Sequence, residues 1–150
     1  LENFQLPSWP RYGFPLKIGK AKKDAEKMGA SLNLKMAGVQ EPVSSLSGGN
    51  AQKVVIGKWL MRQPELLLLD DPTKGVDVGT KAELYKLLTD LTDQGKTIIF
   101  YSSDDEELIG LCDRVLVLHD GKIRTELSGE KLTKENLIAA SLGASEGSIA

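Results

Sequence analysis

The chain has 150 residues and a net charge of −2, with 19 Lys and Arg against 21 Asp and Glu. This length suits one compact domain, or a piece of one, and is too short for two domains of ordinary size. Because the charges nearly balance, no bulk field attracts nucleic acid or anionic lipid, and any phosphate binding must be local. The apolar stretches at residues 54–61 and 66–69 fall far short of the roughly 20 residues that span a bilayer.

The first residues of the chain and its single cysteine suggest no binding or catalytic site. The first residues, LENF, contain no initiator Met, no basic leader and no apolar signal core, and we interpret them as a cut into a longer protein. The single cysteine, Cys112, excludes an internal disulfide, is compatible with a reducing cytosol, and is interpreted as a small core hydrophobe.

The first third of the chain is predicted to form a loop and then a helix. Proline and glycine interrupt residues 6–15 too often for regular structure, which indicates a loop packed by its aromatic side chains. Apolar residues then recur at three- and four-residue intervals over residues 18–32, which predicts an amphipathic helix. Lysines lie largely on the other faces, and we interpret them as a solvated surface rather than a binding patch.

A buried helix and a buried strand are expected next. Residues 49–61 are apolar nearly all round, which favours a buried helix. The aliphatic run at residues 66–69, which Pro72 ends, is typical of a central parallel strand buried on both faces. Thr80 and Glu83 then have the spacing of a capping box, which predicts the start of a helix that ends at Gly95.

Shorter elements complete the chain. Strands are predicted from turn residues and apolar patterns at residues 97–101, 114–118 and 122–127, and a helix at about 134–141. Ser103 and Glu106 repeat the spacing of a capping box, which predicts the start of a short helix. Asp120-Gly121 predicts a hairpin turn. The only histidine, His119, lies at the mouth of this hairpin and is interpreted as a surface turn residue. The order of elements predicts an α/β fold with a mostly parallel sheet, whose ligands bind after Leu69 and Tyr101.

Residues 46–53, LSGGNAQK, place a serine and two glycines at the start of a predicted helix. Unpaired backbone N–H groups and the helix dipole make such a start a site for anions, and glycine lets a phosphate approach the backbone closely. The structural alternative is an N-cap serine before a flexible turn.

Two adjacent carboxylates, Asp70 and Asp71, end the strand at residues 66–69. Neighbouring side chains of a strand point to different sides, so one carboxylate can hold the water shell of a metal while the other faces a reacting water. The alternative is an acidic boundary between strand and turn.

Together these motifs resemble those of ABC-type ATPases. Residues 46–53 are similar to the signature motif in the LSGGN-x-QK form typical of monosaccharide importers, and residues 66–79, LLLLDDPTKGVDVG, look like the Walker B strand and D-loop at the family's spacing. The resemblance implies a P-loop NTPase-like ABC ATPase domain fragment. It would comprise part of a helical subdomain at residues 1–45, the signature, Walker B, D-loop and switch regions at 46–143, and a flexible tail at 144–150.

The resemblance also implies which residues meet nucleotide. Ser47, Gly48 and Gly49 would contact the γ-phosphate of an ATP held mostly by a partner domain, and Asn50 belongs to the same turn. Asp77 falls at the D-loop aspartate, which couples the two nucleotide sites of a dimer. A carboxylate that starts a helix is the alternative for Asp77.

Three positions bear on hydrolysis. By resemblance Asp70 supports Mg²⁺, and Asp71 stands where the family usually has a general-base glutamate, a role worth roughly 10²- to 10⁴-fold in rate. Asp71 keeps the charge but is one methylene shorter. Ser103 occupies the place of the usual switch histidine and offers one hydrogen bond without the reach or charge of an imidazole. An N-cap is the alternative for Ser103, and a serine here also resembles the second ATPase half of sugar importers in which two such domains are fused.

The sequence contains no G-x-x-x-x-G-K-[ST], the loop that wraps nucleotide phosphates. By resemblance, the Walker A strand, Q-loop and adenine-stacking segment would precede Leu1. We therefore expect the chain alone to be inactive, and to supply a lid in trans to an ATP on a neighbouring domain.

The expected parent is an ATP-hydrolysing subunit, with ATP and Mg²⁺, that powers sugar import from the cytoplasmic face of the membrane. Its expected partners are a second nucleotide-binding domain, transmembrane permease subunits and, indirectly, a sugar-binding protein, with no nucleic acid. Two alternatives remain open. One is a nucleotide-binding but catalytically degenerate regulatory half, which the residues Asp71 and Ser103 suggest; the other is a soluble ABC protein of translation or DNA repair.

Overall fold

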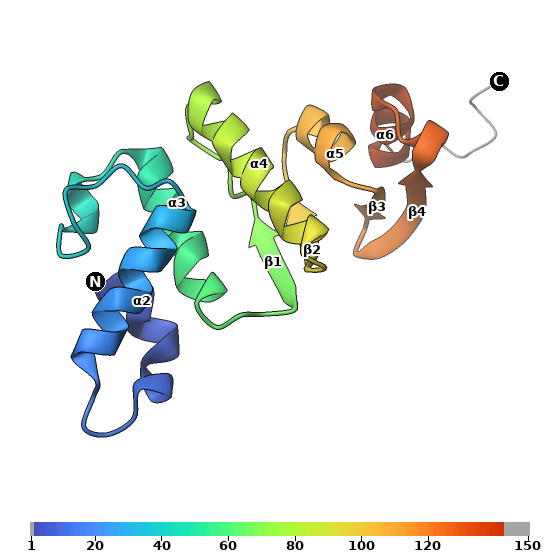
Figure 1. The fold of residues 1–150 in the computed structure, drawn as a ribbon. Helices are drawn as coiled ribbons and strands as arrows, with labels where there is room; N and C mark the ends of the chain where they lie inside the picture. Colours follow the sequence, from blue (N-terminus) through green and yellow to red (C-terminus); the bar gives the residue numbers. More distant parts are fainter. Residues whose placement is uncertain (1, 143–150) are drawn as a thin grey trace. The chain divides into compact units, whose positions relative to one another are not determined.

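The structure, a computed structural model, describes residues 2–142, so the predicted tail at residues 144–150 lies outside the described part. The chain divides into two compact units, the first formed by Leu1–Leu68 and Pro72–Ile99 and the second by Leu69–Asp71 and Phe100–Ala150 (Figure 1). Among residues 2–142, no helix has both the length and the apolar character needed to cross a membrane.

The first unit is mainly helical. It contains α1 (Glu2–Gln5), η1 (Leu6–Tyr12), α2 (Ile18–Ser31), η2 (Val43–Ser45), α3 (Gly48–Leu60), α4 (Val78–Asp93) and most of β1 (Leu66–Asp70) and β2 (Thr97–Tyr101), where η marks a 3-10 helix. Its main core joins α1, α2, α3 and the loop between α2 and α3 through Phe4, Ala25, Leu32, Val39, Val54 and Met61. The helices predicted at residues 18–32 and 49–61 therefore form close to their expected bounds.

The predicted loop at residues 6–15 instead begins with η1. Proline is tolerated in the first turn of a helix, where its missing N–H has no partner to lose, which accounts for Pro7, whereas Pro10 lies inside the 3-10 helix. The segment is anchored by Gln5, whose Nε2 donates to the Ala21 carbonyl of α2. Aromatic packing is only partly as expected, because Tyr12 is buried whereas Phe14 is fully exposed.

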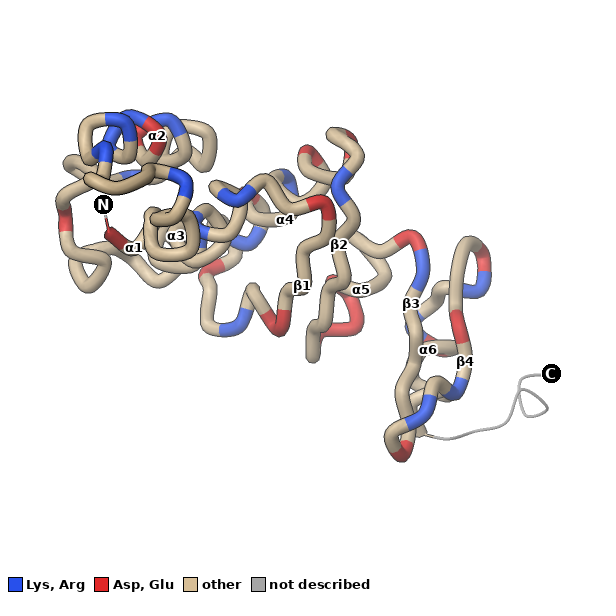
Figure 2. Tube along the Cα trace, turned by 90° about the horizontal axis from the view of Figure 1, so that it is seen from below, with Lys and Arg blue, Asp and Glu red and all other residues tan. Residues whose placement is uncertain are grey.

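The lysines of α2 face solvent, as the sequence predicts. Figure 2 shows Lys and Arg gathered along this helix. The exposed residues are Lys17, Lys20, Lys22, Lys23 and Lys27. The opposite stripe buries Ala21, Ala25 and Gly29, so the helix is amphipathic.

β1 and β2 form a two-stranded parallel sheet. Thr97 N–H donates to the Glu65 carbonyl at 2.8 Å near the start of both strands, and Asp71 N–H donates to the Tyr101 carbonyl at 2.9 Å at their ends. The prediction that β1 is buried on both faces is wrong. Leu67 and Leu69 are buried, but Leu66 and Leu68 are 53% and 73% exposed, because the described chain covers one face of the strand only.

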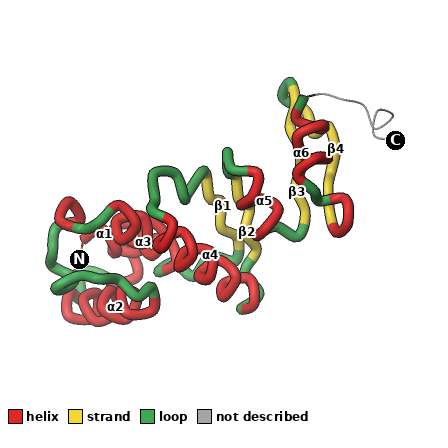
Figure 3. Tube along the Cα trace, turned by 90° about the horizontal axis from the view of Figure 1, so that it is seen from above, coloured by secondary structure: helices red, strands yellow, loops and turns green. Residues whose placement is uncertain are grey.

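The second unit is built on an antiparallel hairpin. Besides the ends of β1 and β2, it contains α5 (Asp105–Leu111), β3 (Arg114–His119), β4 (Lys122–Ser128), η3 (Gly129–Lys131) and α6 (Lys134–Ser141). Figure 3 shows α6 beside β3 and β4. Their apolar side chains form a second core of Val115, Val117, Leu127, Leu137 and Ala140.

The hairpin residues behave as predicted. Asp120 and Gly121 have φ of 49° and 72°, and a type I′ turn needs positive φ at both central positions. His119 is exposed as predicted, with Nε2 3.6 Å from the Asp120 carboxylate, but it is the last residue of β3 rather than part of the turn. Cys112 is half-buried against the second core, and burial raises the pKa of its thiol.

Both predicted capping boxes are wrong. The N-cap of α4 is Asp77, whose Oδ1 accepts from Thr80 N–H at 3.0 Å, so α4 begins before Thr80. The N-cap of α5 is Asp104, whose Oδ1 accepts from Glu106 N–H at 3.1 Å. In both places an aspartate is available as the cap, and its carboxylate also interacts favourably with the positive end of the helix dipole.

The buried side of α4 gives a direct test of this packing. Leu84 is 1% exposed, and we predict that Leu84→Ala lowers the free energy of unfolding by about 2–5 kcal/mol through lost burial and a residual cavity. Urea unfolding followed by circular dichroism measures the change. On the same helix Val78 is 85% exposed, and Val78→Ala should change it by less than about 0.5 kcal/mol. Equal effects of the two variants would contradict the packing of α4.

Candidate functional site

The first unit presents the motif at residues 46–53, here called the signature turn, at the start of α3. Ser47 is the N-cap, and its Oγ accepts from Asn50 N–H at 3.4 Å and from Asn50 Nδ2 at 2.9 Å. Because both bonds are accepted by this oxygen, the hydroxyl proton remains available as a donor. Ser47 and Gly48 are exposed. The capping role and the anion-binding role predicted for Ser47 are therefore compatible in one geometry.

Asn50 uses its side chain within the protein. Its Nδ2 donates to Ser47 Oγ, and its Oδ1 accepts from Lys35 N–H at 3.1 Å. The side chain thus links the signature turn to the segment that follows α2. Asn50 is one of the four residues of this turn that are predicted to meet nucleotide. Its side-chain amide instead forms hydrogen bonds with Ser47 and with the backbone of Lys35.

The D-loop, residues 75–79, leads into α4. Asp77 is exposed, and its carboxylate accepts from Thr80 N–H at 3.0 Å and from Thr80 Oγ1 at 2.7 Å. The hydrogen bond from the Thr80 hydroxyl, with the one from its backbone N–H, lowers the pKa of Asp77. The helix-start alternative for Asp77 is thus present in the structure, and its coupling role remains a prediction.

Two contacts between α3 and α4 were not anticipated from the sequence. A Cβ added to Gly49 would lie 2.7 Å from both Cβ and Oγ1 of Thr80, so only glycine allows this approach. Lys53 is 3% exposed, and its Nζ lies 2.5 Å from Glu83 Oε2. A lysine within an otherwise apolar helix is the signal that could have revealed the pair, because a buried charge needs a partner.

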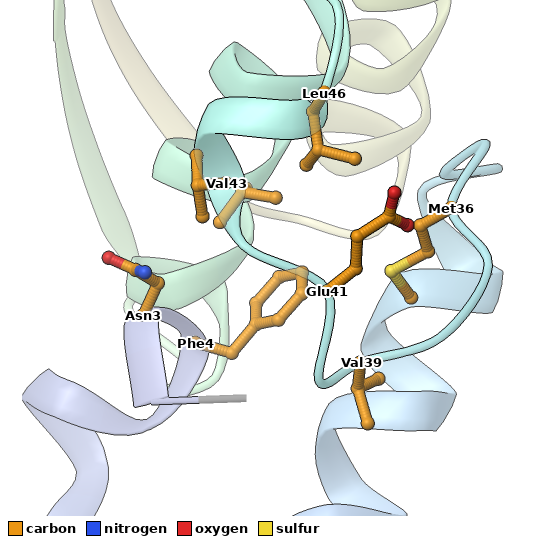
Figure 4. Close-up of a pocket in the computed structure, with 8 residues that line it drawn as sticks. Asn3, Phe4, Met36, Val39, Glu41, Val43 and Leu46 are labelled. Carbon is orange, nitrogen blue, oxygen red and sulfur yellow. The ribbon is translucent and has the colours of Figure 1, made fainter.

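A small pocket lies behind the signature turn and is too small for nucleotide. It is lined mainly by apolar side chains, among them Phe4, Met36, Val39, Val43 and Leu46 (Figure 4). Its volume is about 10 Å³, about enough for one water molecule. Its acidic side chain, Glu41, accepts from Ala37 N–H at 2.7 Å and from Ser45 Oγ at 2.9 Å. The pocket therefore belongs to the packing of the first unit.

In the second unit, Asp70 ends β1 and Asp71 begins the next turn. Asp71 has φ of 46°, in the left-handed region that aspartate tolerates better than most residues. Its N–H is bonded to the Tyr101 carbonyl at 2.9 Å, which ties the turn to the end of β2. Sparsely populated backbone conformations of this kind concentrate at functional sites. This one fixes where the Asp71 carboxylate lies.

The structure brings Asp71 and Ser103 together. Ser103 Oγ donates to the Asp71 carboxylate, at 3.3 Å from Oδ2 and 3.5 Å from Oδ1, although the residues are 32 positions apart. The N-cap alternative for Ser103 is wrong, because Asp104 fills that position. An exposed serine beside a carboxylate can orient it toward a water, and the carboxylate can accept a proton from that water.

A buried hydrogen bond fixes the turn after β2. Ser102 Oγ donates to Glu107 Oε2 at 2.6 Å and accepts from Asp104 N–H at 3.0 Å. Ser102 and Glu107 are 6% and 4% exposed. Sequence reasoning missed both residues, since nothing in the acidic run DDEE shows which carboxylate is buried. The pair positions the backbone on which Ser103 stands.

Asp70 is the predicted support for Mg²⁺. The described residues contain no group of three or more His, Cys, Asp or Glu that could hold a metal alone. Mg²⁺ in phosphate-binding sites keeps several waters and uses one or two carboxylates together with substrate phosphates. An exposed carboxylate at a strand end, such as Asp70, fits a metal that arrives with its nucleotide.

Known proteins share these features. The family described as ABC transporter matches residues 2–74, which include the signature turn and both aspartates. The ribose import ATP-binding protein RbsA 1 of Mesorhizobium japonicum is 60% identical over 111 residues, which are 74% of this chain and 22% of that protein. A putative ribose/galactose/methyl galactoside import ATP-binding protein of Rhizobium meliloti is 47% identical over 138 residues, 92% of this chain and 27% of that protein. The chain spans about a quarter of the length of these curated relatives.

Solved structures agree on the fold. A nucleotide-free ATP-binding cassette from an ABC transporter has a TM-score of 0.77 at 24% identity, covering 91% of this chain and 58% of that one. A dimeric cassette in a post-hydrolysis state, bound to ADP and Pi, has a TM-score of 0.73 at 28% identity, covering 88% of this chain and 56% of that one. The predicted fold class, a P-loop NTPase-like α/β fragment, is confirmed. The chain therefore belongs to the ABC transporter family, as a fragment of an ATP-binding cassette related to those of ribose import.

Proposed function

We propose that the chain is part of an ATP-hydrolysing subunit that powers the import of a monosaccharide. The observation that carries the proposal is the contact between Asp71 and Ser103 at the ends of two parallel strands. A carboxylate and a hydroxyl at that edge suit the activation of a water in front of a phosphate. The relatives named for ribose and galactose import support a monosaccharide as the cargo.

The two units contribute different steps. In the first, the Ser47 hydroxyl and the exposed start of α3 bind the γ-phosphate of an ATP that a second nucleotide-binding domain holds. In the second, Asp71 takes a proton from the attacking water, and Ser103 orients the Asp71 carboxylate. When bound, ATP with Mg²⁺ supplies the phosphoryl group to be transferred, and Asp70 would hold the metal. The chain alone lacks the phosphate loop and is inactive.

The partners follow from this assignment. The subunit acts at the cytoplasmic face of the membrane with transmembrane permease subunits, which receive sugar from a sugar-binding protein. The serine at position 103 supports a place in the second ATPase half of a fused pair. Nucleic acid has no part, because Lys and Arg, at 19, are balanced by 21 Asp and Glu.

Replacement of Asp71 tests the hydrolytic role in the full-length parent. We predict that Asp71→Asn lowers the ATPase kcat of this half roughly 10²- to 10⁴-fold with KM for ATP little changed, because the general base is lost while binding remains. Asp71→Glu should retain or raise kcat, since it restores the longer carboxylate. Asp113→Asn, at an exposed carboxylate before β3, is the control and should match the parent. Steady-state phosphate release measures all variants.

Phosphate release by the Asp71 variants also tests the second candidate function, a regulatory half that binds nucleotide without turnover. The short carboxylate at Asp71 and the serine in place of an imidazole favour this regulatory role. If Asp71→Asn leaves turnover unchanged while ATP still binds, this half is regulatory and the hydrolytic proposal is overturned.

The cargo is tested by reconstitution. We predict that the full-length parent, assembled in vesicles with its permease, hydrolyses ATP faster when a ribose-loaded binding protein is present than when the sugar is omitted, because transport and hydrolysis are coupled. Xylose and galactose serve as matched sugars. If none of these sugars changes the rate of ATP hydrolysis, the result would instead support a soluble ABC protein.

A further inference from the structure

Two contacts in the first unit join the starts of α3 and α4 along one seam. The first is the close approach of Gly49 to Thr80, and the second is the ion pair of Lys53 with Glu83. Gly49 and Lys53 are four residues apart on α3, and Thr80 and Glu83 are three apart on α4. These spacings put each pair of residues on one face of its helix. The ion pair therefore lies one turn further along the same interface.

The ion pair of Lys53 with Glu83 restricts how α3 and α4 can move against each other. Lys53 is 3% exposed, so its ammonium depends on the partner for charge compensation, whereas the Glu83 side chain is 49% exposed. The hydrogen bond from Lys53 lowers the pKa of Glu83. A buried lysine whose partner stands on another helix restricts the sliding of the two helices. An exposed pair does not, because water replaces the partner.

The ends of this seam carry functional groups. Ser47 caps α3, and Asp77 caps α4. Thr80 connects them, since it packs on Gly49 and donates to the Asp77 carboxylate with both its N–H and its hydroxyl. A shift of α3 along α4 would therefore change the position of Ser47 relative to Asp77.

We propose that Lys53 and Glu83 are positioning residues that hold the signature turn and the D-loop as one rigid body. The serine that meets the γ-phosphate and the aspartate at the neighbouring helix start then move together when a second nucleotide-binding domain closes on ATP. The proposal rests on the proposed function for its effect on hydrolysis, but the rigid body itself is a property of the first unit alone.

The variant Lys53→Met tests the pair in the full-length parent, because methionine keeps an unbranched apolar side chain in the buried site and leaves Glu83 in water. We predict that it lowers the ATPase kcat roughly 10- to 100-fold through misplacement of Ser47, with KM for ATP nearly unchanged. Glu83→Gln should lower kcat less, and the double variant should be no worse than Lys53→Met. Lys86→Met is the matched control, since Lys86 forms an exposed pair with Asp90 at 2.9 Å on the same helix.

A structural readout separates this proposal from the proposed function. Spin labels at exposed Val55 of α3 and Val78 of α4, in a full-length parent whose native cysteines, Cys112 among them, are replaced by serine, report the distance between the helices. We predict a narrow distribution that broadens in Lys53→Met and Glu83→Gln and not in Lys86→Met. If the distance distribution broadens in these variants but the unmodified parent shows no ATPase activity, the proposed function is overturned and the positioning role of the pair is supported. An unchanged distance distribution in a folded Lys53→Met protein would overturn the positioning role of Lys53 and Glu83.

Discussion

The parallel pairing of β1 with β2 is the constraint on which the contact between Asp71 and Ser103, the site proposed for hydrolysis, depends. It brings the ends of two strands to one edge, where the Asp71 N–H meets the Tyr101 carbonyl and the Ser103 hydroxyl meets the Asp71 carboxylate. Neither residue could find the other through local structure, because they are 32 positions apart. The positive φ of Asp71 and the buried bond of Ser102 with Glu107 then fix the two turns that carry them.

In the first unit, an exposed serine caps the start of α3, and the proposed ligand is an ATP held by another domain. The signature turn achieves this with little enclosed volume, since Ser47 and Gly48 are exposed and the nearby pocket has room for about one water. Contacts beneath the exposed turn fix the position of Ser47. Asn50 holds the serine oxygen, Gly49 lets α3 touch Thr80, and the buried Lys53 joins α3 to α4.

Sequence reasoning succeeded where local chemistry decides the outcome. The strand at residues 97–101, the helix at 134–141 and the Asp120-Gly121 turn form as predicted, because their patterns and turn residues leave few alternatives. It failed where nearby groups compete or where distant segments meet. Thr80 and Ser103 had capping-box spacing, yet Asp77 and Asp104 cap the helices.

For the site, the motif spacing identified Asp71 and Ser103, and the structure places them in contact. The support around them could not be predicted, because burial of Lys53 and Glu107 depends on tertiary packing. The exposed face of β1 was missed for a related reason: an aliphatic strand looks the same in sequence whether one or both faces are covered by the chain at hand.

The central claim is that the signature turn meets the γ-phosphate of an ATP bound by another nucleotide-binding domain. Orthovanadate with ADP and Mg²⁺ occupies the place of that phosphate, and ultraviolet light then cleaves the backbone beside the vanadate. In the full-length parent, we predict a cleavage product that maps to Ser47 and appears only when both nucleotide-binding domains are present. Cleavage confined to the phosphate loop, with the signature turn intact, would contradict the account.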